Sequence, residues 1–332
     1  MNPTVADLGE HAVIKRIRAR VPTPPGWVST GIGDDAAVLA PERNRSEVIT
    51  TDSLVEGVHF DRSYVPPEAI GHKALAVNLS DLAAMGAEPR AALLSLVLPA
   101  SLPVADLDGL IGGLLELAAR HGVALVGGNV ARSPGPLVVD VTVTGTVKAR
   151  AVMLRAGAKP GDGLYVSGAI GAAHAGFLAL RAGDGGEDLD TCRERFLKPE
   201  PRLRLGLLLG RNRVASACVD LSDGLADAVH QVAAASRAGI IVFAEDLPIP
   251  HEAVQRLSRD GGDPVEAAIG GGEDYELLFT VPRRRRRALE AVLRAAGGLP
   301  CTRIGTVTAD RALVLRRAGS DGALPGGFAH FR

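Results

Sequence analysis

The sequence predicts a two-domain protein of the α/β class, in which strands and helices are mixed in both halves. Three observations support this prediction. At 332 residues the chain is too long for one hydrophobic core. Segments with strand-like and helix-like hydrophobic periodicity follow one another along it. The segment Lys148–Gly163 includes the turn-forming run Lys159-Pro160-Gly161, a composition typical of a junction. We therefore expect domains at residues 1–148 and 149–332.

The first half is expected to form a mixed sheet with helices. Thr4 and Asp7 form a capping-box pattern that opens a helix running to about Arg20. A strand at 47–51 would carry Thr50, Thr51 and Asp52 at its end, where ligand sites of α/β proteins tend to form. The other expected elements are a helix at 66–84, a buried strand at 91–98, a helix at 107–120, a short strand at 123–126 ending in Gly127-Gly128, and a strand at 137–147.

The second half is expected to form a second α/β domain. A strand at 217–219 leads into Asp220, and a helix follows from residue 225 to about 237. Further strands are expected at 164–166, 240–244, 275–281 and 301–307, and further helices near 172–182, 202–209, 252–259 and 284–296.

Composition and charge exclude several classes of protein. Hydrophobic residues make up 46% and charged residues 23%, which is ordinary for a soluble globular protein. A formal net charge of −1 predicts no general attraction to nucleic acid or to anionic membranes. The three cysteines lie far apart and form no CxxC pair, and the first 20 residues include Asp7 and Glu10 without an apolar core. We expect a cytoplasmic protein.

Acidic residues stand beside glycines and small hydroxyl residues in stretches that otherwise have the composition of core. A buried carboxylate without a partner is costly, and no matching lysines or arginines lie beside these acids in the sequence. Hard cations, which prefer oxygen ligands, would supply the missing charge. The pattern therefore indicates a chain that holds magnesium and a polyphosphate. The stretches are Gly31–Asp35, Thr50–Asp52, Asn78–Asp81, Val219–Gly224 and Gly270–Asp274.

Each stretch alone also has a purely structural interpretation. Gly31–Asp35 has the composition of a turn, and Asp81 suits the solvated face of a helix as well as a ligand position. A helix N-cap explains either Ser222 or Asp223, but not Asp220 in addition. Glycine-rich turns at 127–129 and 168–171 can donate backbone N–H groups to phosphate. Their joint occurrence favours the functional interpretation.

Several familiar catalytic motifs do not occur in the sequence. It contains no G-x-x-x-x-G-K-[ST] loop, no H-E-x-x-H and no G-x-S-x-G. His59 follows the Thr50–Asp52 stretch closely, although a lone histidine is more often structural. The arginine run at 283–287 is expected to be a solvated helix face, because aromatic residues make up only 3% of the chain.

Taken in order, the motifs resemble the thiamine-monophosphate kinases, within the wider family of aminoimidazole-ribonucleotide-synthetase-like ATP enzymes. The stretches KALAVNLSDLAAMGA at 73–87 and GGEDYE at 271–276 are the most specific, and others span nearly the whole chain: 31–35, TTDSLVEGVHF at 50–60, 125–129, RAGAKPGD at 155–162 and 219–224. The resemblance implies an N-terminal domain that dimerises through its strands and a C-terminal domain that completes the active site.

The same resemblance implies ATP-dependent phosphorylation of thiamine monophosphate to thiamine diphosphate with several Mg²⁺ ions. Carried over position by position, the family's metal ligands resemble Asp34, Thr50, Thr51, Asp52, Asp81, Asn129, Asp220 and Asp223. Its ATP contacts resemble Gly128, Arg155 and Ser222, and its thiamine-phosphate side resembles His59, Glu273 and Phe328. Nucleic acid and membranes are not expected partners, whereas a second copy of the chain is.

Two positions depart from the family pattern. Asn129 stands where an aspartate is usual, which keeps an oxygen ligand but removes a charge. Phe328 stands where tyrosine or tryptophan is frequent, and a phenyl ring keeps its stacking face but has no polar group. Alternative functions are a ribonucleotide or selenophosphate synthetase, a non-catalytic maturation partner, and a metal-dependent phosphohydrolase. A selenophosphate synthetase would be expected to carry an N-terminal reactive cysteine, whereas the first cysteine here is Cys192.

Overall fold

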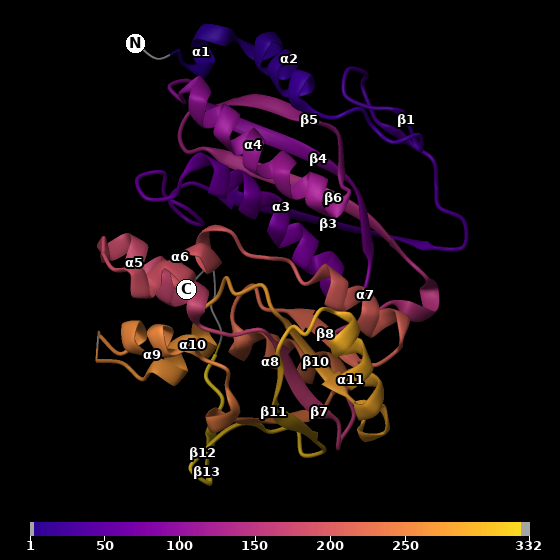
Figure 1. The fold of residues 1–332 in the computed structure, drawn as a ribbon, viewed down its shortest axis with the longest axis vertical. Coiled ribbons are helices and arrows are strands. Elements are labelled where there is room, and N and C mark those ends of the chain that lie inside the picture. Colours follow the sequence, from indigo (N-terminus) through magenta and orange to yellow (C-terminus); the bar gives the residue numbers. More distant parts are fainter. Residues whose placement is uncertain (1–2, 260, 327–332) are drawn as a thin grey trace. The chain divides into compact units, whose positions relative to one another are not determined.

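The chain folds into two compact units, each with its own sheet (Figure 1). The computed structural model describes residues 3–259 and 261–326. The first unit comprises Met1–Leu79 and Glu88–Val147, and the second comprises Ser80–Ala87 and Lys148–Arg332. Helix α3 (Pro67–Ala84) contributes residues to both. Both units mix helices with strands, which confirms the predicted α/β class.

Unit 1 begins with α1 (Val5–Leu8) and α2 (Glu10–Arg20) instead of the single helix that was predicted. The capping box is present, because the Asp7 carboxylate accepts hydrogen bonds from the Thr4 backbone N–H and hydroxyl, both at 2.8 Å. The helix is interrupted at Gly9, whose backbone angles (φ 74°, ψ 162°) are not helical. A small hairpin of β1 (Val28–Thr30) and β2 (Val38–Leu39) follows.

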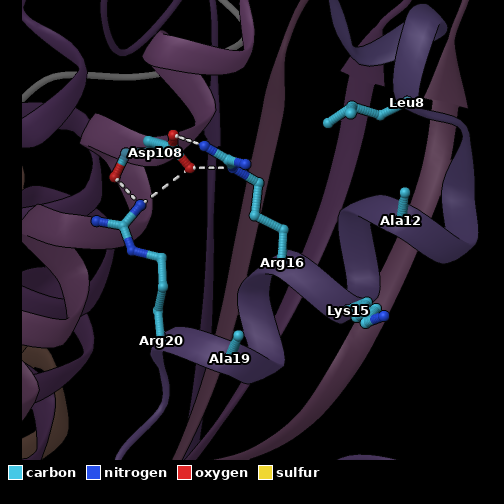
Figure 2. Close-up of a pocket in the computed structure, with 7 residues that line it drawn as sticks. All are labelled: Leu8, Ala12, Lys15, Arg16, Ala19, Arg20 and Asp108. Carbon is cyan, nitrogen blue, oxygen red and sulfur yellow. Dashed lines mark hydrogen bonds and ion pairs between the residues drawn. The ribbon is translucent and has the colours of Figure 1, made fainter.

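A shallow cavity of about 600 Å³ is lined by residues of α1, α2 and α4 (Val104–His121), several of them charged (Figure 2). Arg16 Nε donates to Asp108 Oδ1 at 2.6 Å, and Arg20 Nη1 donates to the same Oδ1 at 3.1 Å and to the Asp108 backbone oxygen at 2.7 Å. The two guanidinium groups therefore share one carboxylate, and these contacts link α2 to α4 at the wall of the cavity.

The sheet of unit 1 has four strands in the order β3-β6-β4-β5. Its strands are β3 (Ser46–Val55), β6 (Val138–Val147), β4 (Glu88–Pro99) and β5 (Ala124–Ser133). Strand β6 runs antiparallel to β3 and β4, whereas β4 and β5 are parallel, so the sheet is mixed, as predicted. Two predicted strand ends are wrong: β3 continues beyond Thr51, and β5 continues through Gly127 and Gly128. Both strands extend because β6 and β4 provide pairing partners along their whole length.

Helices α3 and α4 cover one face of this sheet (Figure 1). The side chains of Val139, Val141 and Val143 on that face are completely buried. Helix α3 lies close to α4 at Gly71, where a Cβ would be 1.8 Å from the Leu110 carbonyl oxygen. The alternate residues of the strands form the opposite face, which is called the open face below.

Unit 2 contains a seven-stranded sheet in the order β13-β12-β9-β11-β7-β10-β8. All neighbours are antiparallel except β12 and β9. Its core is built from strand residues such as Leu164, Val219 and Leu278 around α8. The strands are β7 (Gly163–Ser167), β8 (Ala217–Asp220), β9 (Gly239–Phe243), β10 (Leu277–Val281), β11 (Cys301–Thr308), β12 (Leu313–Arg317) and β13 (Ser320–Ala323).

The helices of unit 2 include several that the sequence did not predict. Those near the predicted positions are α5 (Ala172–Ala182), α7 (Leu203–Arg211), α8 (Leu225–Ser236), α9 (His251–Leu257) and α11 (Arg286–Ala295). The short helices α6 (Asp190–Leu197) and α10 (Pro264–Gly270), like β12 and β13, were missed because segments this short show little periodicity. Among the helices of the described residues, none combines the length and apolar character needed to cross a membrane.

Candidate functional site

In unit 2, the segments that carry the predicted ligands Asp81 and Asp220 contact each other. Asp220 ends β8 and is only 5% exposed. Its Oδ2 accepts a hydrogen bond of 2.7 Å from the hydroxyl of Ser80, which is completely buried and directly precedes Asp81 in α3. The fold therefore brings together two acidic stretches that are 140 residues apart in the sequence.

The loop after Asp220 is not explained by helix capping. The N-cap residue of α8 is Gly224, which places Ser222 and Asp223 before the cap position. The structural interpretation that capping would account for one of them is therefore wrong. Both residues are half-buried.

The loop Gly271–Glu276 lies along this acidic loop of unit 2. The backbone N–H of Glu273 donates to the backbone carbonyl oxygen of Ser222 at 2.7 Å, and that of Tyr275 donates to the carbonyl oxygen of Leu221 at 3.0 Å. In return, the Leu221 N–H donates to the backbone carbonyl oxygen of Glu276 at 2.8 Å. Predicted metal, ATP and substrate residues (Asp220, Ser222, Glu273) thus lie on two directly bonded loops.

The carboxylate of Asp274 has a different partner from the cation that was expected. Its oxygens accept hydrogen bonds from the backbone N–H groups of Gly171 at 2.7 Å and Ala173 at 3.2 Å, at the start of α5. Burial raises the pKa of Asp274 to about 7, although these two hydrogen bonds act in the opposite direction. For this acid, the compensating positive charge is the N-terminal end of a helix.

In unit 1, a cavity of about 510 Å³ opens on the open face of the sheet. Asp34, Gly128 and Asn129 of the predicted site line it, together with Asp35 and Asp140. The packing of the sheet also requires glycine at position 128, because a Cβ there would be 1.8 Å from the Leu94 carbonyl oxygen. The structure therefore brings together the glycine-rich loop at 31–35 and the turn sequence at 127–129.

The stretch Thr50–Asp52 lies inside β3, and its side chains alternate between the two faces of the sheet. Thr51 points to the open face, where its Oγ1 is 2.9 Å from Thr142 Oγ1. Thr50 and Asp52 pair with Val143 and Val141, whose side chains lie on the helix-covered face. The side chains of Asp52 and Asp34 are therefore not on the same face of unit 1.

Two of the remaining predicted residues, His59 and Arg155, lie on loops. His59 is half-buried, and its Nδ1 accepts a hydrogen bond of 3.0 Å from the Val55 N–H, so the neutral ring carries its proton on Nε2. Arg155 is exposed in unit 2. Phe328 lies outside the residues that the structure describes.

The carboxylate and hydroxyl oxygens of both units are donors of the kind that Mg²⁺ prefers. In the described parts of the chain, no group of three or more His, Cys, Asp and Glu side chains is close enough to hold a metal ion. Mg²⁺ is usually bound through one or two carboxylates together with substrate phosphates, so a preformed cage of acids is not needed. The buried Asp220, whose Oδ2 is oriented by the Ser80 hydroxyl, offers a carboxylate of the kind that suits such a role.

The sequence did not single out two polar residues, Asp140 in unit 1 and Glu276 in unit 2. Asp140 lines the cavity of unit 1, and its Oδ2 accepts a short hydrogen bond from the Ser53 hydroxyl. The alternation of β6 would have placed Asp140 on the polar face. Glu276 is completely buried against two arginines, and no local signal indicated that pairing.

Comparisons with known proteins match both halves of the chain. The model for the AIR synthase related protein N-terminal domain matches residues 33–147, and the model for the C-terminal domain matches residues 159–317. The thiamine-monophosphate kinase of Salmonella typhimurium is 39% identical over 305 residues, which is 91% of each chain.

Solved structures give the same result. The thiamine-monophosphate kinase of Stenotrophomonas maltophilia K279a superposes with a TM-score of 0.81 at 39% identity, over 95% of this chain and 98% of that one. AaThiL, solved in complex with AMPPCP and TMP, superposes with a TM-score of 0.77 at 32% identity, over 98% of both chains.

Proposed function

The chain belongs to the thiamine-monophosphate kinases within the AIR synthase related family, and on this premise we propose that it transfers the γ-phosphate of ATP to thiamine monophosphate. The product would be thiamine diphosphate. The observation that carries the proposal is the likeness of the whole chain, at 32% identity and 98% coverage, to a relative solved with AMPPCP and TMP.

The chemistry of the acceptor fits the residues that the sequence provides. A phosphate monoester has a second pKa of about 6 and is largely dianionic at neutral pH. It is already a nucleophile, so the transfer needs no general base, and we assign none. The main obstacle is repulsion between two polyanions, which the protein has to overcome by positioning and by charge compensation.

Oxygen-bearing side chains of the two units would hold Mg²⁺. When bound, Mg²⁺ neutralises phosphate oxygens and stabilises the charge that develops during in-line transfer. Ser80 orients the carboxylate of Asp220 through its hydrogen bond to Oδ2. The residues we assign as ligands would hold more than one ion: Asp34, Thr51 and Asn129 at the open face of unit 1, Thr50 and Asp52 on its other face, and Asp81, Asp220 and Asp223 in unit 2.

Other polar residues would bind the two substrates. We assign Gly128, Arg155 and Ser222 to ATP. On the acceptor side, the Nε2–H of His59 would donate to the phosphate, because the Val55 N–H occupies Nδ1. The thiazolium ring of thiamine is cationic, so Glu273 would supply a countercharge and Phe328 an aromatic face.

We also propose that the protein is a homodimer formed through the open face of unit 1. Ile49 is 68% exposed and Leu93 is 42% exposed on that face, whereas α3 and α4 cover the other. Two copies joined there would remove these apolar side chains from water. A cytoplasmic location is part of the same proposal, supported by three free cysteines.

The test is a product assay with ATP, Mg²⁺ and a panel of phosphate acceptors that includes thiamine monophosphate. We expect ADP and thiamine diphosphate in equal amounts, and background turnover in an Asp220→Asn control. Release of inorganic phosphate without an acceptor would favour a phosphohydrolase. Turnover only with a ribonucleotide or with selenide would favour a synthetase, and no turnover with any acceptor would favour a maturation partner.

A further inference from the structure

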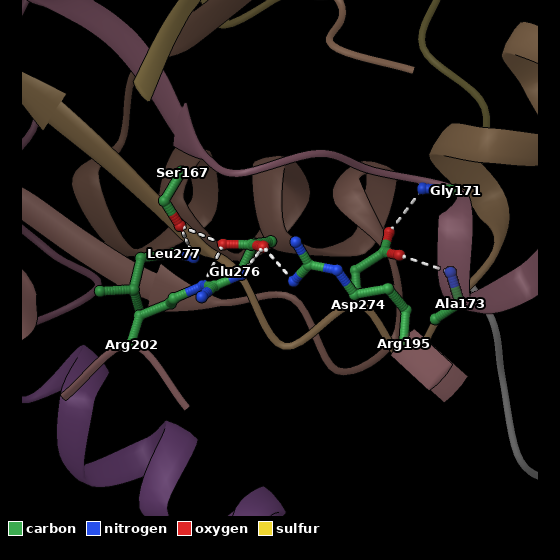
Figure 3. A network of polar contacts seen from close by, with 8 residues as sticks. All are labelled: Ser167, Gly171, Ala173, Arg195, Arg202, Asp274, Glu276 and Leu277. Atoms are coloured by element: carbon green, nitrogen blue, oxygen red, sulfur yellow. Dashed lines mark hydrogen bonds and ion pairs between the residues drawn. The ribbon is translucent and has the colours of Figure 1, made fainter. Parts of the chain in front are cut away.

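A buried ion-pair network holds the side chain of Glu276, the last residue of the loop Gly271–Glu276 (Figure 3). Glu276 is completely buried, and its Oε2 accepts hydrogen bonds from Arg202 Nε at 2.7 Å and from the Ser167 hydroxyl at 2.6 Å. Its Oε1 accepts a short hydrogen bond from Arg202 Nη2 and a longer one, 3.3 Å, from Arg195 Nη1. Arg202 therefore holds the carboxylate with two prongs, which fixes its position and its orientation.

The network leaves little room for the carboxylate to move. A Cβ on Gly168 would be 2.0 Å from Glu276 Oε1, so the carboxylate packs directly on that backbone. The Arg202 side chain is 10% exposed, whereas that of Arg195 is 35% exposed and lies at the rim. The Ser167 hydroxyl also accepts a hydrogen bond of 2.9 Å from the Leu277 N–H, which connects the network to β10.

Buried and strained residues alternate along the same loop. Asp274 and Glu276 point inward to α5 and to Arg202 (Figure 3). Between and before them, Glu273 (φ 77°) and Tyr275 (φ 48°) have left-handed backbone conformations, which are unfavourable for residues other than glycine. Such a conformation persists only where the surroundings impose it, and the contacts of the two inward carboxylates are among those that hold the loop here.

This loop in turn fixes the acidic loop of unit 2. Three backbone hydrogen bonds join it to Leu221 and Ser222, and the contact continues into the sheet as the pair Leu277 and Asp220. A buried ion pair adds little net stability, because desolvation offsets its attraction. The geometry that it imposes on neighbouring backbone is the more specific consequence.

We propose that Arg202, Glu276 and Asp274 are positioning residues, which hold the backbone of Glu273 and, through it, the Asp220–Asp223 loop in the geometry required for phosphoryl transfer. This inference rests on the proposed function for the role of the two loops. The network itself contacts neither substrate in this assignment and acts through the loops.

The test compares two arginine-to-lysine variants. Arg202→Lys keeps the positive charge but removes the two-pronged contact with Glu276. Arg256→Lys is the matched control, because Arg256 is also buried (5% exposed) and pairs with Asp184, at 2.8 Å between Nε and Oδ2, on the far end of α5. Both changes weaken an ion pair made by a buried arginine of unit 2, and only Arg202 contacts the loop Gly271–Glu276.

The first readout is amide hydrogen exchange at Leu221, Glu273 and Tyr275 in the protein without substrates. We expect exchange at least about tenfold faster in Arg202→Lys, which corresponds to about 1.4 kcal/mol, and within about twofold of wild type in Arg256→Lys. Exchange that is unchanged in Arg202→Lys, or that rises equally in both variants, would overturn the positioning role.

The second readout is steady-state kinetics with ATP and thiamine monophosphate. We expect kcat to fall at least about tenfold in Arg202→Lys with a smaller change in KM, and to stay near wild type in Arg256→Lys. If Arg202→Lys does not fold, Glu276→Gln and Asp274→Asn replace it, because each removes one inward charge and keeps the side-chain shape. If the exchange result holds but wild type does not phosphorylate thiamine monophosphate, only the proposed function fails.

Discussion

Lys73 is a buried cation in α3, and raising the pH from 7 to 8.5 should stabilise the folded protein through it. The residue is 2% exposed, and burial lowers the pKa of its ammonium group to about 7. In the unfolded chain the pKa is about 10.4, so between these values the unfolded state binds more protons than the folded state. The free energy of unfolding therefore rises with pH in that window.

The magnitude follows from the two pKa values. Integration of the proton-binding difference from pH 7 to 8.5 gives roughly 1.5 kcal/mol of added stability. The assay is urea denaturation of wild type and of Lys73→Met at both pH values. Methionine has a similar length and no charge, so the variant should lack the increase, and other titrating groups cancel in the comparison. If the two proteins showed the same pH dependence, Lys73 would not have the lowered pKa that its burial implies.

Four further substitutions test the assigned site and the proposed dimer interface. Asp52→Asn and Asp81→Asn should each reduce turnover about 100-fold or more, roughly 3 kcal/mol, with unchanged circular dichroism, and wild-type turnover would remove them as essential ligands. Ile49→Asp should convert a dimer to a monomer in sedimentation velocity, because it replaces an exposed apolar side chain of the proposed interface with a charge, and an unchanged sedimentation coefficient would exclude that interface. Phe328→Ala should raise the KM for thiamine monophosphate and change that for ATP little, whereas an unchanged KM would eliminate the stacking contact.

The sequence predicted the type of the long elements better than their ends. Helix α3 was predicted from its proline start and alanine-rich interior, which are local features. The end of β3 was wrong, because pairing with β6 continues to Val55 and Val138 and depends on a partner about 80 residues away. Local patterns therefore indicate an element, whereas the partner strand determines its length.

A similar distinction applies to the site. Acids such as Asp220 stand out in the sequence because carboxylates are unusual inside apolar strands. The partners of such acids do not stand out: Arg202 is 74 residues from Glu276, and Ser80 is 140 residues from Asp220. The opposite orientations of Thr51 and Asp52 also follow from strand alternation, once β3 is known to extend beyond them.

Transfer of labelled phosphate tests the central claim most directly. With ATP labelled at the γ-phosphate, thiamine monophosphate and Mg²⁺, we expect the label in the terminal phosphate of thiamine diphosphate, in an amount equal to the ADP formed. Label that appears only in inorganic phosphate, while thiamine monophosphate remains unchanged, would contradict direct transfer between the two substrates.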